Sequence, residues 1–360
     1  MWFKSVGINT ILSIDNPIPG DTSEQRASMK KLNRILVPTD FSDGSRKAYS
    51  YAEHLLRFFG GKVDMINIVP TIKYLQENMK KLGYPFSLDN DVYPQIMEHA
   101  HDNVRKEMED HLSEEHRGEP IVRIGRKAYE IILEHAHKER YDLIVMGAQG
   151  LHADKIIRGH VTEKVIRHSR IPVLSVSGSV MPEITQNILV PTDFSEFSMR
   201  AILPAAIMAG RLKSRITLFN VNELHGSEPE EDPNAENDAI RKFRKKVAKK
   251  VHDFFAERPK ARIRLSSIED DELFLKLDRD DEQYEIPFHV ERVRGISAHY
   301  EIVDYAEQHA DMIVIATHGR SGLSHLFMGS TSEKVVQWAK IPVLTIRPRE
   351  TYRKKEKTNR

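Results

Sequence analysis

Residues Ala316–Val336 read A-T-H-G-R-S-G-L-S-H-L-F-M-G-S-T-S-E-K-V-V and follow an apolar run, Met312–Ile315. The run has the composition of a buried strand, and three glycines then interrupt the apolar pattern. Ser330 and Glu333 have the spacing of a capping box, so we expect a helix to begin at Ser330. A strand that leads through a glycine-rich loop into a helix N-terminus presents unpaired N–H groups and a positive dipole to an anion. The stretch therefore predicts an α/β fold with an anion site in this loop.

The composition is that of a soluble globular protein with room for two domains. The 360 residues are 40% apolar and 30% charged, with a formal net charge of +1, which gives no general attraction to nucleic acid or membrane. Cysteine is absent, so disulfides, thiolate nucleophiles and cysteine metal sites are excluded. No apolar run approaches the roughly 20 residues that span a bilayer, and Met1–Lys4 does not begin a signal-peptide pattern. We expect a cytoplasmic protein.

The chain contains an internal duplication. Residues Arg34–Ser42, R-I-L-V-P-T-D-F-S, recur as Asn187–Ser195, N-I-L-V-P-T-D-F-S, at an offset of 153. Further on, Asp142–Met146 matches Asp311–Ile315 at 169, and Ile171-Pro-Val-Leu matches Ile341-Pro-Val-Leu at 170. The larger offsets place a net insertion of 16 residues in the charged segment 257–287 of the second repeat. The increase of the offset from 169 to 170 between the last two matches also shows that the first repeat is one residue shorter within its glycine loop.

Strand and helix patterns alternate through each repeat. In the first repeat we expect strands at 35–38, 63–69, 121–124, 143–147 and 173–176, and helices at 45–59, 93–116, 129–138 and 161–168. This alternation predicts a doubly wound, Rossmann-like five-stranded parallel sheet with helices on both faces. We divide the chain into an N-terminal arm (1–31), a first domain (32–178), a second domain (187–348) and a basic tail (349–360).

These motifs, in this order, resemble the universal stress protein family in its tandem two-domain form. The marks are Pro-Thr-Asp-Phe-Ser, the Asp-x-Ile-Val strand, the His-Gly-Arg-Ser-Gly-Leu loop, Gly-Ser at 329–330, and Ile-Pro-Val-Leu. The resemblance implies two doubly wound domains and covers nearly the whole chain except its ends. Many members of the family bind ATP, whereas others have lost the nucleotide loop.

The family's nucleotide loop is glycine, two residues, glycine, nine residues, glycine, then serine or threonine. The second repeat fits with Ala316 in place of the first glycine. A β-like backbone at Ala316 accepts the methyl group, whereas a positive φ would cost roughly 1–2 kcal/mol. The first repeat has Gly147, Gly150 and Gly159, but it lacks one loop residue, has His160 in place of the hydroxyl residue and adds Asp154. We therefore expect the nucleotide in the second repeat and regard the first as degenerate.

The resemblance implies an ATP site, possibly with Mg²⁺ on the phosphates. Asp193 would hydrogen-bond the nucleoside, Val221 and Ile315 would line the adenine pocket, and the glycine loop would wrap the phosphates. The full set of expected site residues is Pro191, Thr192, Asp193, Val221, Ile315, Ala316, Gly319, Arg320, Gly322, Gly329, Ser330 and Thr331. Structural roles remain open beside these, because Asp193 with Glu196, Asp40, and Ser330 could each cap a helix.

A second feature is a basic helix expected at about 236–257. It contains R-K-F-R-K-K-V-A-K-K-V at 241–251, with an apolar stripe through Phe243, Val247, Val251 and Phe254 or Phe255. Its cations could bind anionic lipid or nucleic acid. The preferred interpretation is that the cationic face of this helix is simply solvated. The acidic residues at 269–272 and 278–282 could neutralise its charge. Nucleic acid is an unlikely partner.

Three functional classes follow. The preferred one is a stress-response regulator that binds an adenine nucleotide in the second repeat and acts on an unidentified protein partner. The second is an ATPase, which would be very slow because the P-loop motif G-x-x-x-x-G-K-[ST] and its lysine are absent. The third is a nucleotide-free scaffold. Because members of the family commonly pair through their fifth strands, the resemblance implies that Val173–Val176 and Val343–Ile346 could pair within the chain as a pseudo-dimer, and a homodimer is possible.

Overall fold

The computed structural model describes residues 32–71, 81, 92–148, 160–177, 185–224, 233–268, 272–279, 282–317 and 328–347. We call residues 32–177 the first half and residues 185–347 the second half. The arm at 1–31, the tail at 349–360 and the loop residues Gly319, Arg320 and Gly322 lie outside the described residues.

Strands and helices alternate in the first half as the sequence predicts. Its elements are β1 (Arg34–Thr39), α2 (Asp43–Phe59), β2 (Lys62–Pro70), α4 (Tyr93–His111), η3 (Glu114–His116), β3 (Arg117–Gly125), α5 (Ala128–Lys138), β4 (Leu143–Gly147), α6 (His160–His168) and β5 (Val173–Val176). The helix expected at 93–116 ends earlier, at His111. Glu53 of α2 accepts hydrogen bonds from the backbone and hydroxyl of Ser113, which turns the chain away from the helix.

The second half repeats this order with two additional strands. Its elements are β6 (Asn187–Pro191), α7 (Glu196–Met199), α8 (Ile202–Leu212), β7 (Arg215–Glu223), α9 (Pro233–Ala256), η4 (Pro259–Ala261), β8 (Ile263–Ile268), β9 (Glu272–Arg279), β10 (Glu282–Gly295), α10 (Ala298–His309), β11 (Met312–Ala316), α11 (Ser330–Trp338) and β12 (Val343–Ile346).

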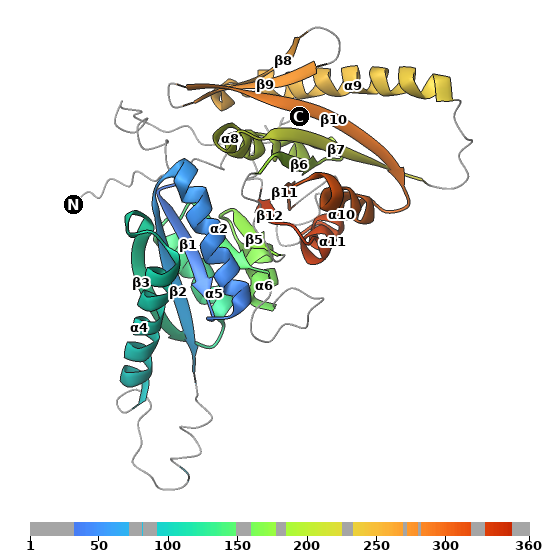
Figure 1. The fold of residues 1–360 in the computed structure, drawn as a ribbon. Helices are drawn as coiled ribbons and strands as arrows, with labels where there is room; N and C mark the ends of the chain where they lie inside the picture. The colour runs from blue at the N-terminus through green and yellow to red at the C-terminus, as the bar shows by residue number, and fades with distance from the viewer. Residues whose placement is uncertain are drawn as a thin grey trace, which may run out of the picture.

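The described strands form one continuous sheet in the order β3-β2-β1-β4-β5-β12-β11-β6-β7-β10-β9-β8 (Figure 1). Within each half the five expected strands pair in parallel, which confirms the doubly wound prediction. The two halves meet where β5 pairs with β12 in antiparallel orientation. The expected pairing of these two strands within one chain is therefore present.

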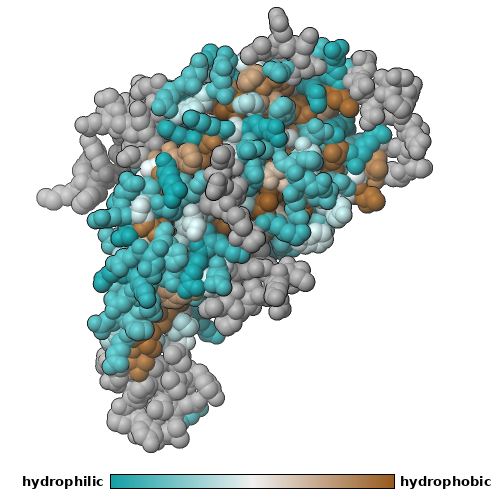
Figure 2. Space-filling view, in the orientation of Figure 1, coloured by the Kyte–Doolittle hydropathy of each residue, from teal (hydrophilic) through white to brown (hydrophobic). Residues whose placement is uncertain are grey.

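Helices cover both faces of the sheet as two continuous layers. One core cluster joins α2 and α4 of the first half with α7, α8 and α9 of the second, and the other joins α5 and α6 with α10 and α11. In β1, Ile35 and Val37 point into the first cluster and Leu36 into the second. Strands buried on both faces have to be apolar at every position, which explains the unbroken runs in the sequence. The face shown in Figure 2 is predominantly hydrophilic, with hydrophobic residues in small groups.

The joint between the halves is apolar and hydrogen-bonded. Leu174 and Leu344 face each other at its centre and both are fully buried. Thr345 Oγ1 donates to Val173 O at 3.0 Å. At the side of the joint, Arg167 of α6 forms ion pairs with Glu163 of its own helix and Glu333 of α11, at 2.7 and 2.5 Å. The halves are thus packed as one body.

The inserted segment of the second half forms strands β8 and β9, which the sequence prediction did not include. Both strands are antiparallel to their neighbours and extend the sheet beyond β10. Leu275 and Leu277 point into the core, whereas Lys276 and Asp278 point to the other face. This alternation of buried and exposed side chains is typical of a half-buried strand. The pattern was not recognised in the sequence because the segment contains many charged residues. No helix among the described residues is long and apolar enough to cross a membrane.

The aspartates of the Asp-x-Ile-Val motif anchor the start of the first strand in each half. Asp142 Oδ2 accepts from Arg34 N at 3.1 Å, and Asp311 Oδ2 accepts from Gln186 N and Asn187 N at 2.7 and 2.9 Å. Burial raises the pKa of Asp142 to about 6, although the backbone hydrogen bonds oppose this shift. The motif is therefore a structural feature of the fold.

The raised pKa of Asp142 gives a pH-dependent contribution to stability. Because the folded pKa of about 6 exceeds the unfolded value of 3.8, the folded state disfavours the ionised carboxyl. Stability from this group is therefore lost as pH rises from about 4 through 6, by on the order of 3 kcal/mol. We expect Asp142→Asn to gain that amount relative to wild type between pH 4 and pH 7, measured by urea unfolding at both values. A difference between the two proteins that does not change with pH would contradict this prediction.

Candidate functional site

The strand order places the candidate site in the second half at a topological switch point. The chain leaves β6 towards α7, on one face of the sheet, and leaves β11 towards α11, on the other. Since β6 and β11 are neighbours, the two connections diverge beyond the carboxyl ends of the strands, and we call the region between them the crevice. Ligands of open α/β sheets bind at this position. The strand ends that meet here carry Pro191–Asp193, Val221 and Ile315–Ala316.

The turn after β6 has a defined backbone geometry. Thr192 Oγ1 accepts from Phe194 N at 2.9 Å, and Asp193 Oδ1 accepts from Ser195 N at 3.0 Å. Phe194 has a φ of 59°, in the left-handed region that non-glycine residues rarely adopt. The first half has the same turn, with φ 64° at Phe41 and the same two hydrogen bonds. The turn is thus a property of the fold, and it presents the half-exposed Asp193 at the crevice.

The helix after this turn is capped by serine, so the capping roles considered for Asp193 and Asp40 are wrong. Ser195 Oγ accepts from Ser198 N, and Ser42 Oγ accepts from Ser45 N in the first half, both at 3.2 Å. Glu196 is not a capping partner, because it binds Arg200 and Arg258 at 2.9 and 2.8 Å. The hydrogen bond from Arg200 holds the pKa of Glu196 below its usual range. The aspartates instead brace the turn that precedes each cap.

The other two strand ends supply an apolar wall. Val221 and Ile315 belong to the same core cluster, which also includes Val293 and Met328. Ile315 is buried and Val221 is half-buried. Met328 was not expected from the sequence. The only feature of the sequence that indicates a role for Met328 is its position directly before Gly329. Both residues expected to line the adenine pocket therefore lie on the same face of the sheet, on strands separated by β6.

Helix α11 begins directly above the end of β11. Gly329 N donates to Thr317 O at 2.8 Å, and Ser332 Oγ donates to Ala316 O at 2.8 Å. The predicted start at Ser330 is confirmed, but the capping box is wrong. Gly329 is the N-cap residue without a side-chain cap, and Ser330 is the first helical residue. Ser330 is exposed and Thr331 is half-exposed, so their hydroxyls do not cap the helix. The first-turn N–H groups of α11 lack intrahelical acceptors, which is the property that makes a helix N-terminus able to bind an anion.

The contacts of Thr317 and Ser332 were missed by the sequence prediction, although the repeat contains a signal for one of them. Thr162 Oγ1 of the first half donates to Gly147 O at 2.8 Å, which matches the bond from Ser332 to Ala316 at the offsets of 170 and 169. A hydroxyl residue at this position fastens the helix to the strand in both halves.

The two halves differ at the alanine position. A Cβ atom added to Gly147 would lie 2.1 Å from Gly44 O of the unbroken helix α2, so this contact requires glycine. In the second half the equivalent helix is interrupted at Arg200–Ala201. Pro204 explains the break, since proline lacks an N–H and clashes with the carbonyl four residues earlier. Ala316 is buried in the strand and has no positive φ, so the strain considered from the sequence does not arise.

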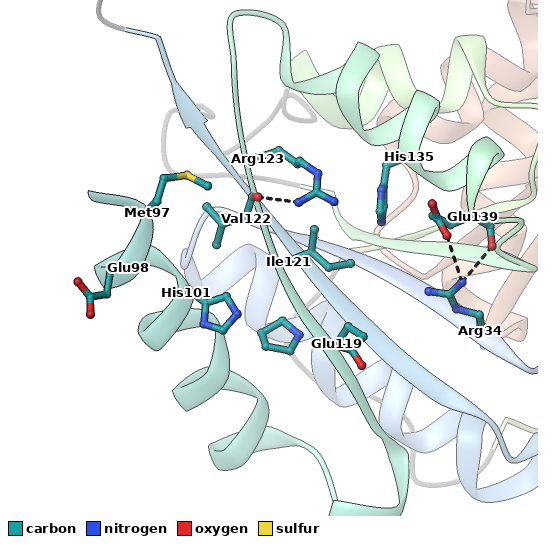
Figure 3. Close-up of a pocket in the computed structure, with 11 residues that line it drawn as sticks. Arg34, Met97, Glu98, His101, Glu119, Ile121, Val122, Arg123, His135 and Glu139 are labelled. Carbon is teal, nitrogen blue, oxygen red and sulfur yellow. Dashed lines mark hydrogen bonds and ion pairs between the residues drawn. The ribbon is translucent and has the colours of Figure 1, made fainter. Parts of the chain in front are cut away.

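A separate cavity of about 610 Å³ lies in the first half, around the edge strand β3 and between α4 and α5 (Figure 3). None of the expected site residues lines it. Its charged groups have mixed signs, and two are engaged with the protein: Arg34 donates to Glu139 O and Arg123 donates to Val122 O. The lining residues are Arg34, Met97, Glu98, His101, Glu119, Pro120, Ile121, Val122, Arg123, His135 and Glu139. The cavity therefore does not serve the predicted nucleotide chemistry.

Comparison with known proteins decides the family. The family model of the Universal stress protein family matches residues 31–177 and again 185–347. The chain belongs to the universal stress protein family. The two matches cover both halves of this universal stress protein, which confirms the tandem form.

Individual relatives match parts of the chain. The universal stress protein MJ0531 of Methanocaldococcus jannaschii is 36% identical over 80 residues, which cover 22% of this chain and 46% of the relative, so about half of its length is matched. MJ0577 of the same organism is 28% identical over 155 residues, or 40% of this chain and 93% of the relative. The crystal structure of a universal stress protein from Archaeoglobus fulgidus has a TM-score of 0.53 at 19% identity, covering 88% of this chain and 98% of that one. This last likeness supports the fold alone.

Proposed function

We propose that the second half binds an adenine nucleotide, ATP, as part of a cytoplasmic stress-response regulator. The observation that carries the proposal is the position of the α11 N-terminus at the switch point. It lies beside the turn that presents Asp193 and the apolar wall of Val221 and Ile315. The crevice thus combines a donor-rich end for phosphates, a carboxylate for ribose hydroxyls and an apolar surface for a base.

In this proposal each part of ATP has its own contacts. The adenine lies against Val221 and Ile315, and Asp193 accepts from the ribose, next to Pro191 and Thr192. The phosphates lie at the start of α11, where Ser330 and Thr331 supply N–H and hydroxyl donors and Gly329, without a side chain, lets a phosphate approach. The glycine loop with Gly319, Arg320 and Gly322 completes the phosphate site, and a Mg²⁺ ion would bind through the phosphate oxygens. Ala316 closes the floor of the site at the end of β11.

The proposed role is regulatory. Hydrolysis requires charge neutralisation and an oriented water, and the sequence lacks the P-loop lysine that supplies much of the former. Any turnover of ATP by this site is expected to be very slow. Nucleotide occupancy would instead change how the surface around the crevice binds a protein partner.

ATP is expected to stabilise the folded protein. A ligand at 100 times its Kd that binds only the native state adds about 2.7 kcal/mol to the free energy of unfolding. The measurement is a thermal melt with and without millimolar ATP and Mg²⁺, with inorganic triphosphate as the control for the adenine contacts. Unchanged melting in ATP, or an equal shift with triphosphate, would contradict the proposal.

A further inference from the structure

Helix α9 carries a dense cationic face that the nucleotide site does not use. Between Ile240 and Val251 it has seven cations and no anion. The seven are Arg241, Lys242, Arg244, Lys245, Lys246, Lys249 and Lys250, of which all except Arg244 are exposed. No carboxylate of the described chain forms an ion pair with Lys245, Lys246 or Lys249. We call these seven residues the α9 cationic face.

The internal duplication supplies a control for what the fold requires at this position. Helix α4 occupies the same place in the first half, between the second and third strands, and packs into the same core cluster. Its sequence has two cations and five carboxylates, a net charge of −3, whereas α9 has seven cations and three carboxylates, a net charge of +4. Packing at this position therefore tolerates either sign of charge. The α9 cationic face needs an explanation other than folding.

The apolar side of α9 packs against the protein core, which excludes insertion of this helix into a membrane. Val247, Val251 and Phe255 are buried in the core against the extended sheet. An interfacial membrane helix would need this stripe for the lipid. In Figure 1, α9 runs along the outside of the second half, across β8 and β10. The exposed side of α9 is predominantly charged, with Ile240 as an exposed apolar residue at its edge.

Two described carboxylates of the nearby acidic segment bind cations outside the α9 cationic face, whereas residues 269–271 and 280–281 of that segment lie outside the described residues. Asp278 binds Arg264 at 3.0 Å, and Glu282 lies 3.7 Å from Arg211 of α8. The side chain of Asp278 is on the face of β9 opposite to the core and hence opposite to α9. Lys245, Lys246 and Lys249 of the α9 cationic face are thus available to an anion from outside the chain.

We propose, in place of the solvated face preferred from the sequence, that the α9 cationic face binds the phosphate backbone of duplex nucleic acid, a partner that the sequence alone made unlikely. Protein interfaces are depleted in lysine and need apolar anchors at their centre, which this face lacks. Lysine and arginine are the residues that contact phosphates. Lys242, Lys245 and Lys249 follow the i, i+3, i+7 spacing of one helix face, over roughly 10 Å of axis. A helix of about 10–12 Å diameter also fits the major groove, which is about 12 Å wide. The contacts are with phosphates, so binding is independent of base sequence.

The test is salt-dependent binding to labelled 20-bp duplexes of DNA and RNA, measured by fluorescence anisotropy on the full chain. The variant is Lys245→Gln with Lys246→Gln and Lys249→Gln, all at exposed positions. We expect at least a tenfold loss of affinity at 50 mM salt. We also expect the slope of log K against log salt to fall in magnitude by about 2.7, because each phosphate that a lysine neutralises contributes about 0.9 to that slope.

The matched control removes the same charge elsewhere, with Lys106→Gln, Arg126→Gln and Lys138→Gln at exposed positions of the first half. This control should retain wild-type affinity and slope, and the melting curves of both variants should match that of wild type. Three results would overturn the proposal. They are wild-type affinity in the α9 variant, an equal loss in the control, or binding of the wild type to vesicles with anionic lipid but to neither duplex.

Discussion

Gly329→Asp is expected to weaken ATP binding at least 100-fold without destabilising the fold. Gly329 has φ −63° and ψ 142°, a conformation open to any residue, and it is the N-cap of α11. Aspartate is among the preferred N-cap residues, so the helix should be as stable or more so. The new carboxylate would lie within about 5 Å of a phosphate. Two like charges at that distance repel by about 3 kcal/mol at an effective dielectric constant of 20, whereas a 100-fold loss needs about 2.7 kcal/mol.

Gly329→Asn is the matched control, because asparagine has the shape and capping ability of aspartate without its charge. It should keep ATP affinity within about tenfold of wild type, measured by calorimetric titration, while both variants melt no lower than wild type. Equal losses in the two variants would mean that size rather than charge is responsible. Wild-type affinity in Gly329→Asp would place the phosphates away from α11.

Leu344→Ala is expected to destabilise the whole chain by about 3 kcal/mol. Leu344 is 1% exposed and faces Leu174 across the pairing of β5 with β12. Removal of a buried leucine costs about 2–5 kcal/mol, because apolar burial is reduced and a cavity is left behind. One core cluster crosses this joint, so the two halves should unfold together in a single transition. Urea unfolding followed by far-UV circular dichroism measures both the midpoint and the number of transitions.

Leu224→Ala is the control for this experiment, since Leu224 is 36% exposed at the end of β7. A change at such a surface position should stay within about 0.5 kcal/mol. The contradicting result is two separate unfolding transitions, of which Leu344→Ala shifts only one. It would show that the halves fold independently.

The sequence predicts most of the fold because the duplicated strands are buried on both faces and are therefore mostly apolar, with few polar residues such as Asp64 and Asn220 within them. It fails at β8 and β9, where only every second residue is buried and the intervening residues are charged. The pairing of the two halves was expected from the family resemblance, because each repeat ends in the Ile-Pro-Val-Leu strand through which family members pair. Strand order is not specified by any local sequence pattern, and it was not predicted.

Site details depended on geometry that a motif does not specify. Thr192, Asp193 and Ser195 are all capable of capping, and the left-handed φ at Phe194 decides in favour of Ser195. The need for glycine at the position that matches Ala316 likewise depends on packing, because in the first half it is the approach of Gly44 O in α2 that requires Gly147. Gly319, Arg320 and Gly322 remain predictions from spacing.

The most direct test of a single nucleotide site in the second half is the stoichiometry of ATP binding by isothermal titration calorimetry. We expect one ATP molecule to bind per chain. Binding should be lost in Gly329→Asp and retained in His160→Asp, which adds the same charge at the exposed start of α6 in the first half. No binding, two ATP molecules per chain, or loss only in His160→Asp would contradict it.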